Sequence, residues 1–228
     1  VSTTSCTEAI FLAADLFDFS LNDEIVVPSI SFPSIGSAVL KSGAKMVLCD
    51  VDRTSLNVRA QDIEKAITPA TKAVFITHYG GVPCDMDPIL TLCKKHGIYL
   101  IEDAACAIKS LYKGKACGTF GDMAMWSFDA MKTVTTGDGA MIYLKSDANV
   151  IKAKELLYLG LPVKQKSGLD SSATGTANWW EFEMNQLGRR AVMNDITAAI
   201  GLCQMKKLPN FLARRQEIHQ YYYDGLKH

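Results

Sequence analysis

A single lysine in a turn between two strand-like runs is the side chain in this sequence most suited to covalent chemistry. The apolar run Met123–Phe128 precedes Lys132, and a Gly-Asp-Gly turn at 137–139 leads into a second run, Met141–Leu144. A lysine enclosed between buried strands must reach solvent, pair with an acid, or lose its hydration and become reactive, as Schiff-base lysines do. Most lysines in turns are solvated, so the rest of the chain has to decide among these roles.

Phe32, His78 and Asp103 also stand at strand ends or in the loop that follows a strand. Asp103 alone is typical of a capping acid, and His78 is typical of a hydrogen-bonded strand-end histidine. In parallel sheets, ligands bind beyond the carboxyl ends of the strands. We therefore expect Phe32, His78, Asp103 and Lys132 to share one rim of a sheet.

The elements that must position these residues alternate along the chain. Strand-like runs are predicted at 23–28, 45–49, 71–78 and 98–103, and helices at 33–41, 60–67 and 86–96. The strand-like runs are continuously apolar, which indicates burial on both faces and a parallel α/β sheet with right-handed crossovers. A Gly-x-Gly-x-x-Gly after the first strand and a Walker lysine are both absent, which argues against a dinucleotide or P-loop site.

A cluster of small hydroxyl residues at 2–7 leads into a helical pattern that begins near Ile10. Such a cluster is typical of a helix N-cap. It also suits an anion site, because free backbone N–H groups and the helix dipole favour a phosphate there. Local sequence leaves both interpretations open.

The second half of the chain is predicted to leave the sheet. A helix is expected at 147–161, a loop rich in Ser, Gly and Thr at 164–178, and an aromatic cluster at 179–182. Two helices are predicted after that, at 194–206 and 210–227, with a break near Pro209.

Composition excludes several classes of protein. The 228 residues carry 24 basic and 24 acidic side chains, so no net field attracts nucleic acid or an anionic membrane surface. No apolar run approaches the roughly 20 residues that span a bilayer. Seven cysteines without a Cys-x-x-Cys pair, and no histidine spacing suited to zinc, predict reduced thiols, no metal site and a cytoplasmic protein. The chain begins at Val1 without Met, and we expect it to be a fragment.

Taken together and in order, many segments resemble one family, the pyridoxal-phosphate-dependent DegT/DnrJ/EryC1/StrS sugar aminotransferases of fold type I. The matching segments are residues 4–9, 23–28, 31–32, 50–52, 67–73, 85–87, 101–105, 112–114, 121–122, 127–128 with Lys132, 137–139 and 193–208. The resemblance implies a mostly parallel, seven-stranded-type sheet flanked by helices, a three-layer α/β/α domain. It also implies a large cofactor-binding domain over residues 1–208 and, at 209–228, the start of a helical connection to a small C-terminal domain. An N-terminal arm and most of that small domain are expected to be missing.

The resemblance also implies roles for individual residues. Lys132 resembles the lysine that forms the internal aldimine and later moves the substrate proton. Asp103 resembles the acid that pairs with the pyridine nitrogen and so keeps the ring an electron sink. Phe32 resembles the aromatic residue stacked on that ring. Thr7 and the backbone amides around Cys6 and Glu8 resemble the phosphate cradle, to which Ser127 adds a hydroxyl.

Four positions depart from the family pattern. Cys106 stands where Gln or His usually lies near the phenolic oxygen of the cofactor, and a thiol is a poor donor. Asp129 replaces a common histidine, and Cys6 replaces the usual glycine of the cradle. Arg190 stands where an Asn often reaches the phosphate in the partner subunit, so an arginine ion pair is expected instead. A solvated surface pair, Arg189 with Arg190, is an equal alternative.

The leading hypothesis is an aminotransferase that moves an amino group, expected to come from glutamate, to a keto sugar, expected to be nucleotide-linked. Its mechanism would be ping-pong, and a homodimer with shared active sites is implied. Two alternatives stay open: a sugar dehydratase of the same fold, and a divergent protein with a binding or regulatory role. Lys132 argues against the dehydratases, which resemble this group but carry histidine there.

Overall fold

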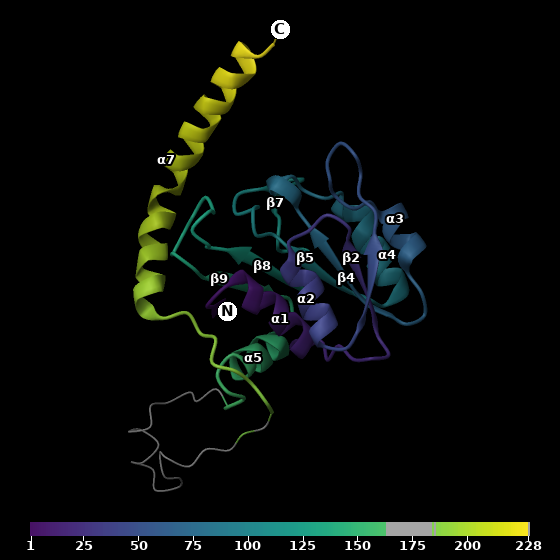
Figure 1. Cartoon of the computed structure of the whole chain (residues 1–228). Coiled ribbons are helices and arrows are strands. Elements are labelled where there is room, and N and C mark those ends of the chain that lie inside the picture. Colours follow the sequence, from purple (N-terminus) through teal and green to yellow (C-terminus); the bar gives the residue numbers. More distant parts are fainter. Residues whose placement is uncertain (163–183, 185, 228) are drawn as a thin grey trace, which may run out of the picture.

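A seven-stranded sheet forms the centre of the computed structural model, which describes residues 1–162, 184 and 186–227 (Figure 1). From edge to edge the strands are β1 (Ser2–Thr3), β9 (Ala140–Leu144), β8 (Met123–Ser127), β5 (Tyr99–Asp103), β4 (Thr71–Thr77), β2 (Glu24–Pro28) and β3 (Lys45–Cys49). The five strands from β8 to β3 are mutually parallel, and β9 runs antiparallel to both β8 and β1. The mostly parallel sheet expected from the sequence is therefore confirmed.

Helices cover both faces of this sheet (Figure 1). One hydrophobic cluster joins the sheet to α1 (Cys6–Leu16), α2 (Pro33–Lys41) and α5 (Asp147–Leu156), and another joins it to α3 (Ala60–Ala66) and α4 (Met86–His96). Successive strand residues alternate between the two clusters: Phe75 and Ile101 belong to the first, and Val74 and Leu100 to the second. This burial on both faces explains the continuous apolar runs and confirms the three-layer α/β/α arrangement.

Short elements connect the strands at the carboxyl edge. A 3₁₀ turn, Tyr79–Gly81, follows β4, and a small hairpin of β6 (Leu111–Tyr112) and β7 (Lys115–Ala116) lies between β5 and β8. Helix α5 ends at Leu156, earlier than the expected Leu161, because the chain turns there. Leu159 and Gly160 both have positive φ, 63° and 74°, which an α-helix does not accommodate.

The predicted break near Pro209 is wrong. One continuous helix, α7, runs from Asp195 to Gly225 with Pro209 inside it. Proline removes one backbone donor, but its fixed φ near −65° is compatible with the helix, and long helical stretches continue on both sides. Leu208 is the buried residue of α7. The first part of the helix lies beside the loop between β8 and β9, where Gly201 faces Thr136, and the C-terminal part extends away from the sheet (Figure 1).

The Ser/Gly/Thr-rich loop predicted at 164–178 and the aromatic cluster at 179–182 lie outside the described residues. Within the described part, none of the helices combines the length and the apolar character that a bilayer crossing requires.

Candidate active site

Three neighbouring strands end in a polar residue on the same face of the sheet. Thr77, Asp103 and Ser127 each stand two positions after a residue of the α1-side core, namely Phe75, Ile101 and Met125. Residues two apart on a strand point to the same side, and Thr77 is the registered partner of Asp103. The apolar stripes that hold α1 and α2 thus end in hydroxyl and carboxyl groups where the carboxyl edge of the sheet begins.

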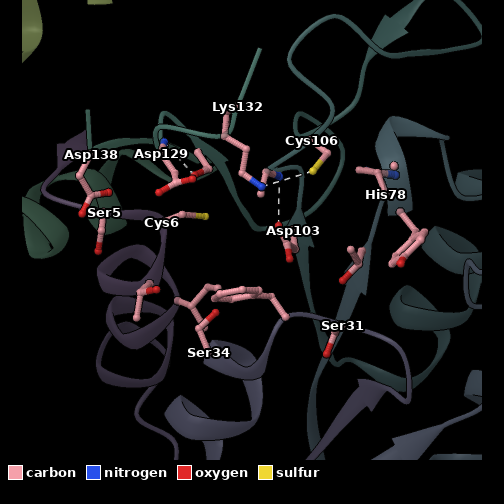
Figure 2. A pocket seen from close by; sticks show the side chains of 18 residues that line it. Ser5, Cys6, Ser31, Ser34, His78, Asp103, Cys106, Asp129, Lys132 and Asp138 are labelled. Atoms are coloured by element: carbon pink, nitrogen blue, oxygen red, sulfur yellow. Dashed lines mark hydrogen bonds between the residues drawn. The ribbon is translucent and has the colours of Figure 1, made fainter. Parts of the chain in front are cut away.

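A pocket of about 660 Å³ opens at this edge, bounded also by the N-terminal ends of α1 and α2. Most of the predicted cofactor residues line it: Cys6, Thr7, Phe32, Asp103, Cys106, Ser127 and Lys132. His78 and Asp129 line it as well, so the expectation that Phe32, His78, Asp103 and Lys132 share one rim is confirmed. Figure 2 shows Ser5 and Cys6 at one end, His78 at the other, and Lys132 reaching in between them.

Lys132 is carried by the loop that connects β8 to β9. Its backbone N–H donates to the carbonyl oxygen of Asp129 at 3.0 Å, and the Asp129 carboxylate accepts the N–H of Met131 at 2.9 Å. This turn directs the Lys132 side chain into the pocket, where Nζ donates to Sγ of Cys106 at 3.4 Å. The amine therefore meets a weak acceptor instead of a carboxylate, which leaves it available to a ligand.

Asp103 presents a buried carboxylate to the same space. It is 4% exposed, and Oδ1 accepts the N–H of Ala105 at 3.0 Å. Burial raises the pKa of Asp103, although this hydrogen bond and the charges of Lys132 and His78 oppose the shift. Within the described residues no donor contacts Oδ2. A cationic N–H group of a ligand would satisfy that oxygen and favour the charged form.

His78 is fully engaged by the protein. Nδ1 accepts the N–H of Cys84 at 3.1 Å, so the ring proton lies on Nε2, which donates to Glu102 at 3.0 Å. This geometry agrees with its interpretation as a satisfied strand-end histidine. His78 forms part of the pocket wall, and the described hydrogen bonds leave neither ring nitrogen for a ligand.

The N-terminus of α1 forms the opposite end of the pocket. Ser5 Oγ caps the helix by accepting the Glu8 N–H at 3.1 Å, and Ala9 N–H donates to the Ser5 carbonyl. The preceding amides, those of Cys6 and Thr7, lie in the first turn, where intrahelical acceptors are lacking. The N-cap interpretation of the hydroxyl cluster is confirmed, because Ser5 Oγ occupies the Glu8 amide. The anion-site interpretation stays a prediction, for which the amides of Cys6 and Thr7, two residues that line the pocket, remain.

Two residues of the predicted set do not line the pocket. The Glu8 carboxylate contacts the guanidinium of Arg189, and the Glu8 N–H donates to Ser5 Oγ, so neither group of Glu8 is available to a ligand as expected. Arg190 is exposed and its guanidinium lies 5.6 Å from the ring centroid of Tyr158. The expected role of Arg190 toward a partner subunit remains a prediction. Arg189 is not a solvated surface residue, because it pairs with both Glu8 and Asp15.

The pocket also contains residues that the sequence interpretation missed. Oγ of Ser34 and Oγ1 of Thr77 are buried, and no partner for either is found among the described residues. Alternation along β4 is a signal that would have found Thr77, but nothing in the sequence singles out Ser34. Phe32, in contrast, is 67% exposed although it lines a pocket. The pocket thus combines the exposed ring of Phe32, two hydroxyl groups without a described partner, and the Asp103 carboxylate with one free oxygen. This combination indicates a polar ligand with a flat apolar part.

Comparisons with known proteins agree with this description. A sequence model of the DegT/DnrJ/EryC1/StrS aminotransferase family matches residues 1–228. A relative from Saccharopolyspora spinosa, dTDP-4-dehydro-2,3,6-trideoxy-D-glucose 4-aminotransferase, is 47% identical over 222 residues, which are 97% of this chain and 57% of that protein. The crystal structure of the aminotransferase TlmJ from Streptoalloteichus hindustanus superposes with a TM-score of 0.90 at 43% identity, covering 99% of this chain and 58% of that one.

A more distant structure is the PLP-form of the putative sugar aminotransferase Spr1654 from Streptococcus pneumoniae. It has a TM-score of 0.86 at 26% identity and covers 99% of this chain and 59% of that one. The chain thus spans a little under 60% of the length of these relatives. On the family match and the identity to these relatives, the chain belongs to the DegT/DnrJ/EryC1/StrS aminotransferase family.

Proposed function

We propose that this chain carries the cofactor-binding part of a pyridoxal-phosphate-dependent aminotransferase that acts on a keto sugar. The observation that carries the proposal is the placement of Lys132 and Asp103 in one pocket. Among the described residues the Lys132 amine has no carboxylate partner and one oxygen of the buried Asp103 is unsatisfied, and both groups face the same space. A purely structural domain has no use for a buried carboxylate with a free oxygen beside a lysine, because the carboxylate loses its hydration there.

The residues present fit pyridoxal phosphate. The amides of Cys6 and Thr7 at the start of α1 suit the phosphate, and the exposed ring of Phe32 suits an aromatic face. Asp103 Oδ2 suits a protonated ring nitrogen, and Lys132 Nζ suits the aldehyde carbon. The orphaned hydroxyls of Ser34 and Thr77 supply further hydrogen bonds. Cys106, beside Lys132, is where the phenolic oxygen is expected, and its thiol offers a weaker donor than the usual side chains.

When bound, this cofactor supplies an electron sink that lets an amino group leave one carbon and join another. The chain contributes the groups around it. Lys132 Nζ would hold the cofactor and would accept and return the proton at the reacting substrate carbon. The Asp103 carboxylate would pair with the protonated ring nitrogen. Phe32 would lie against one side of the ring and shield it.

The proposed substrates are an amino donor such as glutamate and a nucleotide-linked keto sugar. The support is the activity for which the Saccharopolyspora spinosa relative is named, that of a 4-aminotransferase for a dTDP-linked trideoxy sugar. The work of the enzyme would then be amino-sugar biosynthesis. We further propose a homodimer, in which Arg190 of one subunit serves the pocket of the other, and a cytoplasmic location. All seven cysteines belong to the described residues and are free thiols, which supports a reducing compartment.

The test is to add pyridoxal phosphate to the purified chain, record the absorption spectrum, reduce with borohydride and map the labelled peptide. We expect a new band near the edge of the visible range and a pyridoxyl group on Lys132. The matched controls are Lys132→Ala, which should lose both signals, and Lys145→Ala, which changes an exposed lysine beyond the pocket and should keep them.

Cofactor on another lysine, or none at all, would overturn the proposal and favour the regulatory alternative. A positive result would justify the second assay, in which glutamate labelled on its amino nitrogen and a dTDP-keto sugar are incubated with the protein. Transfer of the label to the sugar supports the aminotransferase. Loss of a sugar hydroxyl without transfer of the label favours the dehydratase alternative.

A further inference from the structure

Arg189 runs along the outer face of α1 and contacts it at three points. Its Nε donates to Glu8 Oε2, its Nη1 donates to Asp15 Oδ2 at 2.7 Å, and its guanidinium carbon lies 5.9 Å from the ring centroid of Phe11. Residues 8, 11 and 15 are spaced to share one face of a helix. The arginine thus spans this face from the first turn of α1 to the last.

The backbone holds Arg189 in this position. Its N–H donates to the carbonyl oxygen of Leu156 at 2.8 Å, and its carbonyl accepts the N–H of Leu159 at 3.3 Å. Partial burial opposes the positive charge, but the bonds to Glu8 and Asp15 raise the pKa of Arg189, so the guanidinium stays cationic. The contact with Glu8 is therefore a fixed ion pair, unlike a pair between two mobile surface side chains.

The location of Glu8 gives this pair a consequence for the pocket. Glu8 lies in the first turn of α1, directly after Cys6 and Thr7, which line the pocket and whose amides lack intrahelical acceptors. A helix N-terminus attracts anions, but a carboxylate already in that turn competes with a phosphate for the same field and repels it. A cation held on Glu8 removes the repulsion and leaves the amides to the ligand.

We propose that Arg189 is a positioning residue that neutralises Glu8 and thereby lets α1 hold the phosphate ester of the cofactor. The proposal rests on the proposed function, in which the first turn of α1 receives that phosphate. Two observations independent of the helix end indicate that the pocket takes a ligand. Ser34 is 6% exposed and its buried hydroxyl has no partner among the described residues, and Asp103, 4% exposed, leaves Oδ2 unsatisfied.

The test compares two aldehydes that differ only in the phosphate, pyridoxal phosphate and pyridoxal. Both react with the same lysine, so the ratio of their dissociation constants isolates the contribution of the phosphate. Equilibrium titrations followed by absorbance give both constants without an activity assay. We expect Arg189→Gln to raise the dissociation constant of pyridoxal phosphate about three- to tenfold and to change that of pyridoxal by less than about twofold.

Three further variants show whether the charge on Glu8 is the cause. Glu8→Gln with Arg189→Gln should restore most of the affinity for pyridoxal phosphate, because the repelling carboxylate is gone. Arg189→Lys should retain most of it, because a cation remains beside Glu8. Asp15→Asn breaks the other ion pair of the same arginine, seven residues and about 10 Å along the helix, and should leave the affinity unchanged. Thermal unfolding of each variant checks that the domain is folded.

The inference would be overturned if Arg189→Gln lost affinity for both aldehydes equally, or if the double variant bound pyridoxal phosphate no more tightly than Arg189→Gln alone. Either result would point to a packing role for Arg189. Failure of the wild-type chain to bind either aldehyde would instead contradict the proposed function. The two failures are therefore distinguishable in one set of titrations.

Discussion

His78 donates from Nε2 to Glu102 Oε2 over 3.0 Å, and both side chains are buried. The same carboxylate accepts the N–H groups of Gly118, Phe120 and Gly121 at 2.6–2.8 Å. Glu102 thus joins the end of β4 to the loop that precedes β8, directly behind Asp103. Although burial opposes ionisation, the hydrogen bonds from His78, Gly121 and Gly118 hold the pKa of Glu102 below its usual range.

Glu102→Gln should destabilise the fold by about 3 kcal/mol at neutral pH, because an amide NH₂ would face backbone donors. Because the pKa of Glu102 is lower in the folded state, the ionised carboxylate stabilises the fold. This stabilisation is complete above the pKa of glutamate in the unfolded chain, about 4.3, and is lost as the pH falls through the pKa of the folded state. The difference between wild type and variant should therefore narrow in acid. Urea unfolding at pH 7 and at pH 3 measures this difference, and a difference that does not depend on pH would contradict this account.

Asp103→Asn should stabilise the ligand-free protein while weakening cofactor binding. The asparagine keeps Oδ1 for Ala105 N–H and removes a buried charge. Because burial raises the pKa of Asp103, the aspartate costs stability as the pH rises above its unfolded value of about 3.9. We expect Asp103→Asn to raise the free energy of unfolding by about 1 kcal/mol at pH 7, and this gain should disappear near pH 3. Denaturant titrations at both pH values, with pyridoxal phosphate titrations beside them, check the two effects.

Cys106 should be protected from alkylation by pyridoxal phosphate. It is an exposed thiol beside Lys132 in the pocket, whereas Cys203 is an exposed thiol on α7 that is not part of the pocket. Iodoacetamide labelling followed by mass spectrometry should show that the ligand slows the alkylation of Cys106 by about tenfold or more, since the bound ligand would cover the thiol. Cys203 should react at its original rate. Equal protection of both, or of neither, would place the ligand elsewhere.

Gly118→Ala should be much more damaging than Gly114→Ala, although both glycines have φ above +80°. A Cβ at Gly118 would meet the Trp126 ring, with Cε2 at 2.7 Å, whereas a Cβ at Gly114 would meet open space. In both variants an alanine at positive φ should lower the free energy of unfolding by about 1 kcal/mol, and in Gly118→Ala the clash with Trp126 should add about 2 kcal/mol or more. Thermal unfolding of the two variants separates strain from crowding, and similar losses would mean that Trp126 moves aside freely.

Most helix and strand positions in the first 145 residues were predictable because their signals are local, but the two-residue strands β1, β6 and β7 were not predicted. The helix at Met86–His96 combines an acidic first turn, a basic last turn and Gly97 in the left-handed conformation. Where the outcome depended on tertiary context, the sequence was insufficient. The turn after Leu156 depends on the segment at 186–191, whose backbone accepts and donates hydrogen bonds there. Pro209 lies in an exposed helix that tolerates the loss of one hydrogen bond.

The candidate site shows the same division. Asp103 and Lys132 were predictable because strand ends and turns determine where such residues lie. Ser34 was not, because its burial depends on how α2 packs against the sheet. From the sequence, Arg189 is expected only as one member of a solvated surface pair with Arg190, and the fold shows that it reaches α1 instead. A contact between residues 181 positions apart leaves no local pattern.

The contacts between the first residues of the chain and its second half also set the order in which the pocket can form. Thr3 Oγ1 donates to the carbonyl oxygen of Ala191 across 188 positions, and β1 pairs with β9. Contacts of such separation close late, because a long loop must be ordered first. Helix α1 is synthesised early, yet it lacks its sheet edge and its arginine until residue 191 has been made. In a growing chain the proposed phosphate site at the start of α1 would therefore stay incomplete until that point.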